Sequence, residues 1–461
     1  QAKTLFPYTT LFRSKTTATA TYYVADGGSD SNACTSSGAG ACLSLSGVFA
    51  KLPYKIDNAV TINVAAGTYV DRPWLNDYDV TAGITILGPA LATATVATGT
   101  ATGTLTGVNN TAPAVMTDGT QTWTTNDLIG KFLTIGANSR PIAKNDATTI
   151  TLAGPYGSAP SIGAAYTITS PGAVFTSSNS TATLSLNWTG GASSPFLTVL
   201  GVDFVNSSAS GAACDFTLSS QAIFFQNSRC KQTSNGAGLN YRGGGGVFLF
   251  YTTIQGLTGL NFTGSRASAL GFLSMGYALA YGTGSGGLTI SPDTFGLNTS
   301  IGDSTFQTNA SSAASAAVRL FGQTSMSSSV SSAIPVFRCL QSGPAGVRHL
   351  GSAATTTATA NFIADNAYID ACTTGIDFSS GTLGNVTGTI ATAGALTFPA
   401  ASATSGLAGS GVIDIYDYLS AAFEKQATAT QTFKTSTSSG ATTVRTTIAS
   451  TGTSPCRRRP N

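Results

Sequence analysis

Apolar and polar residues alternate with a period of two along much of this chain. The stretches AVTINV at 59–64, LTVLGVDFVN at 197–206 and VFLFYTTIQG at 247–256 show the pattern clearly. Such alternation, interrupted by Gly, Asn, Asp and Ser, predicts short half-buried strands separated by turns. We therefore expect an all-β protein.

The strand-like segments recur along the chain at intervals that fit one turn, or coil, of a β-solenoid. One apolar anchor was taken from each segment, and subtracting neighbouring positions gives steps of 26, 24, 23, 29, 33 and 30 residues. A step of this length fits two or three short strands with their turns, and coils stacked about 4.8 Å apart would bring the anchors into one inward ladder. A β-sandwich with irregular hairpins is the alternative. The anchors are Phe204, Cys230, Ile254, Tyr277, Phe306, Cys339 and Ile369.

The N-terminal part carries a recognisable motif. YYVADGGSDSNAC, then AVTINVAAGTYVD and then GITILGP, within residues 22–89, resemble the start of right-handed parallel β-helix proteins of the pectate-lyase-like superfamily. The resemblance implies a β-solenoid in which Leu43 to Leu52 form a short helix that caps the open end of the core. It implies little about activity, because this fold carries lyases, hydrolases, adhesins and phage fibres.

A second segment resembles a small β module found inserted in phage and secreted β-helix proteins. It covers residues 123–168, and its alternation predicts a compact sheet with Trp123, Phe132, Ile135 and Ile150 inside.

Both ends of the chain need separate treatment. Thr4 to Ser14, TLFPYTTLFRS, resemble a translated sequencing-library adapter, so we set them aside. Residues 432–453 resemble the strand pair that closes phage tail-fibre shafts, and we expect a helix at Tyr416 to Lys425 and a truncated tail.

These observations divide the chain into five expected segments. They are an artefactual N-terminus at 1–15, the first coils at 16–113, the inserted module at 114–170, the β-helix coils at 171–380 and an Ala/Thr/Gly-rich tail at 381–461.

Composition narrows the class of partner. Charged residues make up 9% of the chain, far below the roughly 25% of an ordinary soluble protein, and the net charge is +3. We therefore expect no nucleic-acid partner. Apolar runs are too short for a membrane span, and 42% hydrophobic residues can still fill a large core.

The cysteines suggest one disulfide. Cys34 and Cys42 stand eight residues apart in the Gly/Ser-rich loop NACTSSGAGAC, where a bond can close, as suits an exported protein. Four others, each in or beside an apolar run, are expected to be free buried hydrophobes. No C-x-x-C or Cys/His cluster is present, so we expect neither zinc nor another cofactor. The four are Cys214, Cys230, Cys339 and Cys372.

Catalytic motifs of the resembled superfamily are missing. The N-T-D, D-D and G-H-G motifs of its hydrolases do not occur, and the single His349 reads as a coil-surface residue. The weak candidates are acids: Asp293 and Asp303 as a glycosidase pair, or clustered acids such as a lyase uses for calcium. That cluster would consist of Asp365, Asp370 and Asp377, which equally fit solvated turns.

Two further groups depend on how the coils stack. If Phe204 and Cys230 are neighbours in the ladder, then Asp203 and Arg229 form an ion pair on the outer face, exposed and contributing only about 0–1 kcal/mol. Exposed aromatic rings can stack on the C–H faces of sugars, and a buried aromatic ladder is the alternative reading. The candidates for glycan contact are Tyr241, Tyr251 and Tyr281.

These observations, with the resemblance, favour a β-helix shaft of a phage tail fibre, a tailspike or a bacterial surface protein. It would attach to cell-surface or extracellular polysaccharide, lie outside the cell or on a virion, and form a homotrimer, as the family implies. The alternative is an exported polysaccharide lyase or glycoside hydrolase. A purely structural adhesin repeat is a third reading.

Overall fold

The computed structural model describes residues 15–434 with gaps. Nothing below concerns the residues in those gaps or at the two ends. The gaps are 77, 92–94, 107–112, 157–160, 189–195, 219–221, 264–270, 291–296, 313–314, 322–323, 328–334, 343, 351–356, 364–367, 373, 379–384, 393–405, 410, 418–421 and 428–430.

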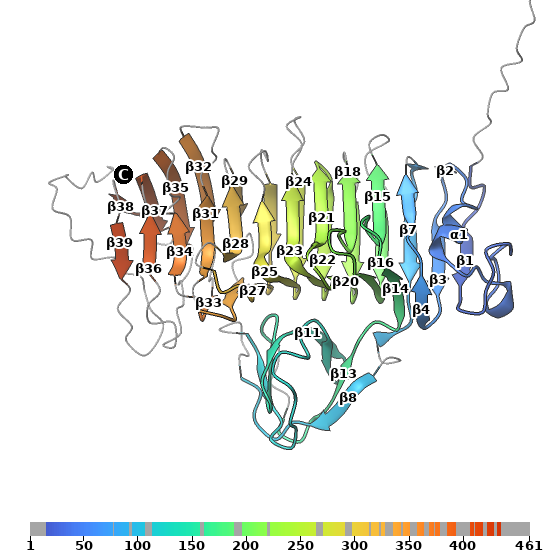
Figure 1. The fold of residues 1–461 in the computed structure, drawn as a ribbon, viewed down its shortest axis with the longest axis horizontal. Helices are drawn as coiled ribbons and strands as arrows, with labels where there is room; N and C mark the ends of the chain where they lie inside the picture. The colour runs from blue at the N-terminus through green and yellow to red at the C-terminus, as the bar shows by residue number, and fades with distance from the viewer. Residues whose placement is uncertain are drawn as a thin grey trace, which may run out of the picture.

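The chain winds into a parallel β-solenoid, as predicted (Figure 1). One wall, the first sheet, has eight parallel strands, and a further parallel stack continues the coils towards the C-terminus. The first sheet contains β1 (Ala20–Val24), β3 (Val60–Val64), β7 (Ile84–Leu87), β16 (Phe196–Leu200), β19 (Ala222–Gln226), β22 (Gly246–Phe250), β24 (Gly271–Gly276) and β26 (Leu297–Ile301). The further stack contains β29 (Thr324–Ser327), β32 (Thr357–Ile363), β35 (Asn385–Thr392) and β37 (Gly411–Asp417).

The opposite wall bends into two legs. β23 (Thr253–Thr263) and β25 (Leu279–Ile290) run through both legs without a break. The first leg also contains β4 (Gly67–Val70), β14 (Ala173–Ser177), β17 (Val202–Asn206), β20 (Arg229–Gln232), β27 (Thr305–Thr308), β30 (Val336–Cys339) and β33 (Tyr368–Asp370). The second leg also contains β5 (Trp74–Asn76), β15 (Leu184–Trp188), β18 (Cys214–Leu218), β21 (Ala237–Gly243), β28 (Ala316–Phe321), β31 (Ala345–Leu350), β34 (Thr374–Phe378) and β36 (Gly406–Gly409).

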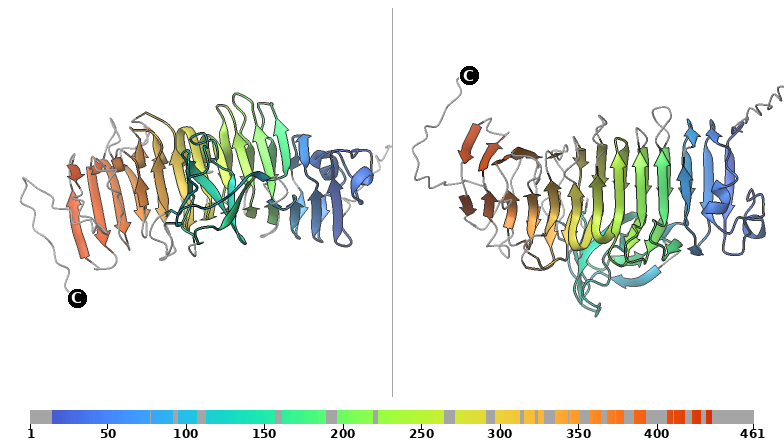
Figure 2. Two further views of the ribbon diagram at one scale, coloured as in Figure 1. Left: turned by 90° about the horizontal axis from the view of Figure 1, so that it is seen from below. Right: turned by 45° about the horizontal axis from the view of Figure 1, so that its top comes forward.

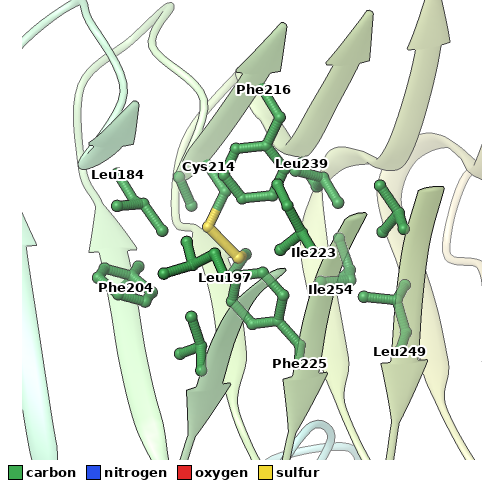
Figure 3. Packing of buried hydrophobic residues seen from close by; sticks show 14 of the residues in the cluster. Leu184, Leu197, Phe204, Cys214, Phe216, Ile223, Phe225, Leu239, Leu249 and Ile254 are labelled. Carbon is green, nitrogen blue, oxygen red and sulfur yellow. A yellow bond between two sulfur atoms is a disulfide. The ribbon is translucent and has the colours of Figure 1, made fainter. Parts of the chain in front are cut away.

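The inward ladder exists, and five of its seven predicted anchors are correct. Phe204 pairs with Cys230, Cys230 with Ile254, and Ile369 lies at the far end. Tyr277 and Cys339 were wrong, because the paired positions are Ala280 and Phe337. Figure 3 shows apolar side chains from the two walls meeting inside the coils, among them Phe204, Phe216 and Phe225.

The error at Tyr277 has a local cause. Four successive coils turn from the first sheet into the first leg through one residue in the left-handed backbone region. Gly201, Asn227, Tyr251 and Tyr277 hold this position in successive coils, with φ of 66°, 50°, 48° and 50°. Tyr277 is therefore a corner residue, and its ring cannot follow the inward alternation of the strand.

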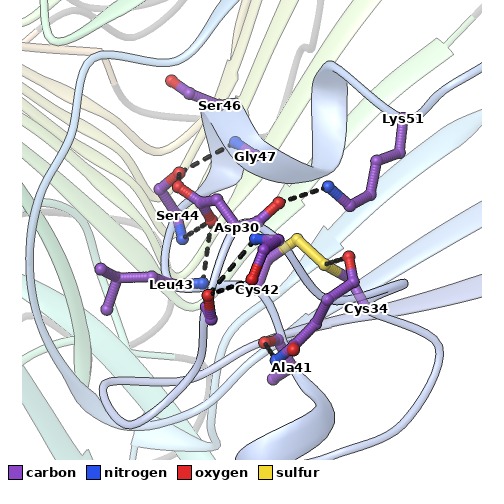
Figure 4. Close-up of a disulfide and its surroundings, with 12 residues drawn as sticks. Asp30, Cys34, Ala41, Cys42, Leu43, Ser44, Ser46, Gly47 and Lys51 are labelled. Carbon is purple, nitrogen blue, oxygen red and sulfur yellow. Dashed lines mark hydrogen bonds between the residues drawn. A yellow bond between two sulfur atoms is a disulfide. The ribbon is translucent and has the colours of Figure 1, made fainter.

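A short helix caps the N-terminal end, as predicted. α1 (Leu45–Phe49) buries Leu45, Val48 and Phe49 against the core. The Ser44 hydroxyl accepts the Gly47 N–H at 2.8 Å, which is an N-cap contact. Asp30 then holds the approach to the helix, since its carboxylate accepts the backbone N–H groups of Leu43 and Ser44 at 2.9 and 3.0 Å (Figure 4).

Three disulfides join the described cysteines. Cys34–Cys42 is confirmed, with Cα atoms 4.9 Å apart. The expectation of free thiols was wrong for the other four, which form Cys214–Cys230 and Cys339–Cys372. Cys214 and Cys230 lie on β18 and β20, and Cys339 on β30 pairs with Cys372 in the turn between β33 and β34. Only the coil stacking, which the sequence leaves open, brings the cysteines of these two pairs within bonding distance.

An antiparallel module interrupts the coils between β7 and β14. Its six strands follow the order β8-β13-β10-β11-β12-β9, and it lies below the solenoid in Figure 1 and across its face in Figure 2. Phe132, Ile135 and Ile150 are buried, as predicted, whereas Trp123, also predicted to lie inside, is only partly buried and packs against the core of the module. The strands are β8 (Thr95–Thr100), which precedes the expected boundary at residue 114, β9 (Val115–Thr117), β10 (Phe132–Ile135), β11 (Asn138–Asn145), β12 (Thr149–Leu152) and β13 (Ala165–Thr169).

The predicted helix at Tyr416 to Lys425 was wrong. β37 and β38 (Ala422–Ala427) are antiparallel strands there. Val412, Ile413 and Ile415 favour a strand, and β37 gains parallel pairing with β35 that outweighs local helix preference. β39 (Gln431–Lys434) pairs with β36, and the rest of the predicted closing strand pair lies outside the described residues. Two short strands, β2 (Lys55–Ile56) and β6 (Asp79–Val80), complete the description, in which no helix is long and apolar enough to cross a membrane.

Candidate functional site

The inserted module packs on the outer face of the first leg at β25 and β27. Its Ile129, Ala143 and Ala153 pack against Leu279 and Tyr281 of β25. Two hydrogen bonds from β27 add polar contacts. Thr305 donates its hydroxyl to the Ala153 carbonyl at 2.6 Å, and Gln307 donates its amide to the Ala143 carbonyl at 2.8 Å. This part of the face is therefore closed to a large ligand.

Arg140 of the module contacts the corner of the coils. Its guanidinium carbon lies 3.9 Å from the ring centre of Tyr277 and 4.9 Å from that of Tyr251. The two tyrosine rings are 5.4 Å apart and nearly parallel. Arg140 is only 7% exposed, and desolvation strengthens such cation–π contacts. Tyr251 and Tyr277, both corner residues in left-handed geometry, thus form the platform that Arg140 of the module contacts.

The predicted ion pair exists, but it is buried. Asp203 and Arg229 are in register, and Arg229 donates to Asp203 through both Nε and Nη2. The Asp203 side chain is 1% exposed and that of Arg229 is 12% exposed. The expectation of an exposed pair was wrong. Asp127 and Lys131 of the module act electrostatically on Lys231, two residues from Arg229, and we infer that the module shields this part of the first leg.

The outer face of the second leg has a different character. Its inward positions hold Leu184, Phe216 and Tyr241, and the residues between them point outwards. Backbone pairing places these outward residues in register from coil to coil. We call this surface the polar face. It consists of Trp74, Asn76, Ser185, Asn187, Asp215, Thr217, Asn240, Arg242, Asn261, Thr263, Thr289, Arg319 and Arg348.

Contacts within the polar face orient its side chains. Asn261 donates its amide to the Asn240 side-chain oxygen at 3.1 Å, across neighbouring coils. Arg242 donates to Asp215 at 3.1 Å and is itself half exposed. Burial raises the pKa of the Asp215 carboxyl, and the charge of Arg242 offsets part of that rise. The face therefore presents amides, hydroxyls and one carboxylate held in fixed positions.

Three polar atoms beneath this face are buried without a hydrogen-bond partner among the described residues. They are Asp215 Oδ1, Thr263 Oγ1 and Thr289 Oγ1, from three different coils. Because they are buried, they offer no contact to a ligand in this arrangement, and the exposed parts of the neighbouring side chains form the surface.

The two ends of the polar face differ. Trp74 begins one row and is 63% exposed, a large apolar ring beside hydroxyl and amide side chains. Arg319 and Arg348 lie in register at the other end, followed by Asp377 on the next coil. Burial and the charge of Arg348 both lower the pKa of Arg319. A ligand along this face would thus meet an aromatic platform first and cationic side chains last.

The three tyrosines proposed for glycan contact fall in different places. Tyr241 is 1% exposed, with its hydroxyl donating to the Gly245 carbonyl, and Tyr281 is 6% exposed beneath the module. In this arrangement neither ring has an open face for a sugar. Tyr251 is half-buried in the stack with Tyr277 and Arg140. Neighbouring strand positions, such as Asn240 beside Tyr241, carry the outward side chains.

The acidic candidates are dispersed. Asp303 is 7% exposed beside Tyr277, where burial and then the nearby carboxylate raise the pKa of the Tyr277 hydroxyl. Asp370 and Asp377 lie on β33 and β34, which are different legs of one coil. Asp293 and Asp365 lie outside the described residues. The part of the chain that the structure describes holds no group of three or more His, Cys, Asp or Glu side chains placed for a metal ion.

Comparison with known proteins adds distant structural likenesses. No protein-family model and no curated protein matches this chain. The chain is similar to the Gp54 tailspike of Acinetobacter baumannii bacteriophage AP22 in complex with A. baumannii capsular saccharide, at 12% identity over 77% of this chain and 74% of that chain, with a TM-score of 0.26. The Pseudomonas phage phi297 tailspike gp61 gives 9% identity over 77% and 76%, with a TM-score of 0.26. A glycoside hydrolase gives 7% identity over 81% and 93%, with a TM-score of 0.25.

Proposed function

We propose that this protein is an attachment shaft that binds a polysaccharide along its polar face. Sugar rings offer hydroxyl groups at their edges and apolar C–H groups on their faces. Asn, Asp, Thr and Arg side chains match the hydroxyl groups, and an exposed indole such as that of Trp74 matches the apolar faces.

The geometry favours a linear polymer over a single small sugar. Neighbouring parallel strands are about 4.8 Å apart, a spacing comparable to the length of one sugar residue in an extended chain. Because the outward residues are in register from coil to coil, the face repeats this spacing along the axis. Weak contacts at successive coils would then add up along one polymer strand.

The observation that carries the proposal is the register of polar side chains on one surface, in which Asn240, Arg242 and their neighbours repeat from coil to coil. On the first leg, the module packs over β25 and β27. The polar face carries half-exposed Arg242 and exposed Trp74 beside its amide and hydroxyl side chains.

The test uses immobilised bacterial capsular and plant cell-wall polysaccharides with the purified chain. Asn240→Ala should weaken binding by up to about tenfold, since a neutral hydrogen bond contributes about 0.5–1.5 kcal/mol. Trp74→Ala should weaken binding through lost stacking. Asn63→Ala, an asparagine on the outward side of β3 in the first sheet, is the matched control and should bind like the wild type. Equal binding by the wild type and by all three variants would refute the polar face as the binding site.

The same incubations test the enzymatic alternative. New reducing ends or absorbance from unsaturated sugars would identify a hydrolase or lyase, and Asp303→Asn would then be the first variant.

The three disulfides bear on the location of the protein. They favour an oxidising compartment, and hence an extracellular or surface position. The homotrimer implied by the family resemblance stays a prediction, measurable by sedimentation.

A further inference from the structure

Polar side chains line the first leg beneath the module, on both sides of β25. Thr253 and Gln255 of β23 lie beneath Gly130 of the module, where an added Cβ atom would stand 3.0 Å from Thr253 Cγ2 and 3.5 Å from Gln255 Oε1. Thr305 and Gln307 of β27 continue the same two rows. We call this surface the covered wall. It consists of Thr253, Gln255, Thr305 and Gln307, with Tyr251 and Tyr277 at the corner.

The docked module leaves several polar atoms at this contact without a partner. Thr253 Oγ1 and Gln307 Oε1 on the coils, and Arg140 Nε on the module, are buried and have no hydrogen-bond partner among the described residues. The three residues are 1%, 0% and 7% exposed, respectively. A buried polar atom without a partner carries a desolvation cost that hydration or a ligand would remove. The docked arrangement therefore includes a cost that is relieved when the module moves away.

The corner of the covered wall presents two aromatic faces. Tyr251 and Tyr277 have φ of 48° and 50°, and side chains in this geometry are concentrated at ligand-binding and switch sites. Their ring planes differ by only 3°, and their centres are 5.4 Å apart. Because one guanidinium, that of Arg140, lies over both rings, both ring faces are turned towards the module. Without Arg140, the two rings would form an open stacking platform.

The module can leave the covered wall as one body. Its six strands form a sheet of their own around a separate hydrophobic core. The chain enters the module after β7 and returns to the coils before β14. Opening would therefore break the contacts of Arg140, Ile129, Ala143 and Ala153 and leave the described strand pairings of the coils in place.

We propose that the covered wall is a second polysaccharide-binding site, which the docked module keeps closed. The class of ligand is that of the proposed function, on which this inference rests, but the wall is a different one. Sugar rings would replace the guanidinium over Tyr251 and Tyr277, and their hydroxyl groups would reach the oxygens of Thr253 and Gln307. Only open molecules bind in this way, so the apparent affinity of the covered wall is proportional to the open fraction.

The experiment measures the open fraction and polysaccharide binding of the full chain side by side. Tyr281 is 6% exposed beneath the module, so its oxidation by hydroxyl radicals reports opening. Gly154→Ala should raise this oxidation about tenfold, because the added Cβ would stand 2.4 Å from the Asp303 carbonyl oxygen. Gly119→Ala is the matched control within the module, since its Cβ would meet only Thr102 Oγ1, at 3.6 Å.

Binding to immobilised bacterial capsular and plant cell-wall polysaccharides should follow the oxidation. Gly154→Ala should bind more tightly by the same factor by which Tyr281 oxidation rises, and Gly119→Ala should match the wild type. Arg140→Ala is the second opening variant, with an expected rise of about 30-fold, should circular dichroism show that Gly154→Ala does not fold.

Removal of the rings identifies the site of the gained binding. Tyr251→Asn and Tyr277→Asn, added to an opening variant, should abolish the gain. Asparagine suits this corner, because Asn227 holds the equivalent position with φ of 50°. Trp74→Ala separates the covered wall from the polar face. A gain that survives Trp74→Ala supports the second site, even where the wild type binds no polysaccharide.

Three results would overturn the proposal. The first is a rise in Tyr281 oxidation without any gain in binding. The second is a gain that disappears with Trp74→Ala, since it would then belong to the polar face. The third is unchanged oxidation in folded Gly154→Ala and Arg140→Ala, which would show that the module does not open.

Discussion

The buried ion pair between Asp203 and Arg229 gives the sharpest test of how the module and the coils fit together. Arg229→Met removes the guanidinium group and leaves the Asp203 carboxylate, 1% exposed, without its bidentate partner. Breaking a buried pair in this way costs about 3–5 kcal/mol. Arg242→Met breaks a comparable inter-coil pair whose side chains are 51% and 29% exposed, and should cost about 0–1 kcal/mol.

Hydrogen exchange is the suitable assay, since long repeat arrays do not unfold in a single two-state step. The free energy of opening of the β17 and β20 amides should fall by about 3–5 kcal/mol in Arg229→Met and stay nearly unchanged in Arg242→Met. Adding Asp203→Leu to Arg229→Met should restore much of the loss, because an apolar pair of similar size needs no counter-charge.

The two methionine variants also separate stability from binding. Arg242 lies on the polar face, so Arg242→Met should weaken polysaccharide binding with little effect on stability, and Arg229→Met should do the reverse at temperatures where it stays folded. If Arg229→Met destabilised the chain no more than Arg242→Met, the pair would be solvated. The inference that the module buries the first leg would then be refuted.

Three further predictions concern the module and the coils. Arg140→Ala should loosen the docked module by about 2 kcal/mol, seen as faster exchange of β25 and β27 amides, because a desolvated cation–π contact is lost. Replacing the Cys214–Cys230 disulfide by two alanines should lower the free energy of opening of the β18 and β20 amides by about 3 kcal/mol in hydrogen exchange, as expected for a closed loop of this length, 16 residues. Burial raises the pKa of Asp118, but hydrogen bonds led by Thr120 outweigh it and lower that pKa below 3.8. The Asp118 contribution to module stability should therefore be complete above pH 3.8, fall away below it, and vanish in Asp118→Asn, as followed by module amide exchange.

The sequence predicted the coil repeat well, and its errors have specific physical causes. Phe204, Cys230 and Ile254 each lie three residues after a corner residue, at the inward position of the strand that follows it. Tyr277 failed because it is itself the corner residue, and the inward position of its coil lies three residues later at Ala280. Tyrosine is rare in that geometry, and a sequence pattern gives no sign of it.

The polar face was predictable in part. Asn240 and Asp215 each stand between two apolar residues of a strand, which marks them as outward positions. Their alignment into one surface depends on the register between coils, and this requires knowing where each loop ends. The same register decides that Cys214 meets Cys230, which the sequence-based expectation of free thiols missed.

The position of the module explains why one polar row, and not another, is open to a ligand. The first leg has its own register of polar residues, Lys231, Gln255, Gln307 and Arg338, of which Gln307 is fully buried and Arg338 is 2% exposed. The module enters the chain at the corner between the first sheet and the first leg, so the wall beside that corner is the one it covers. An insertion at the opposite corner would have covered the polar face instead. Because the coils share the same three walls, a single insertion point decides which wall the module packs against.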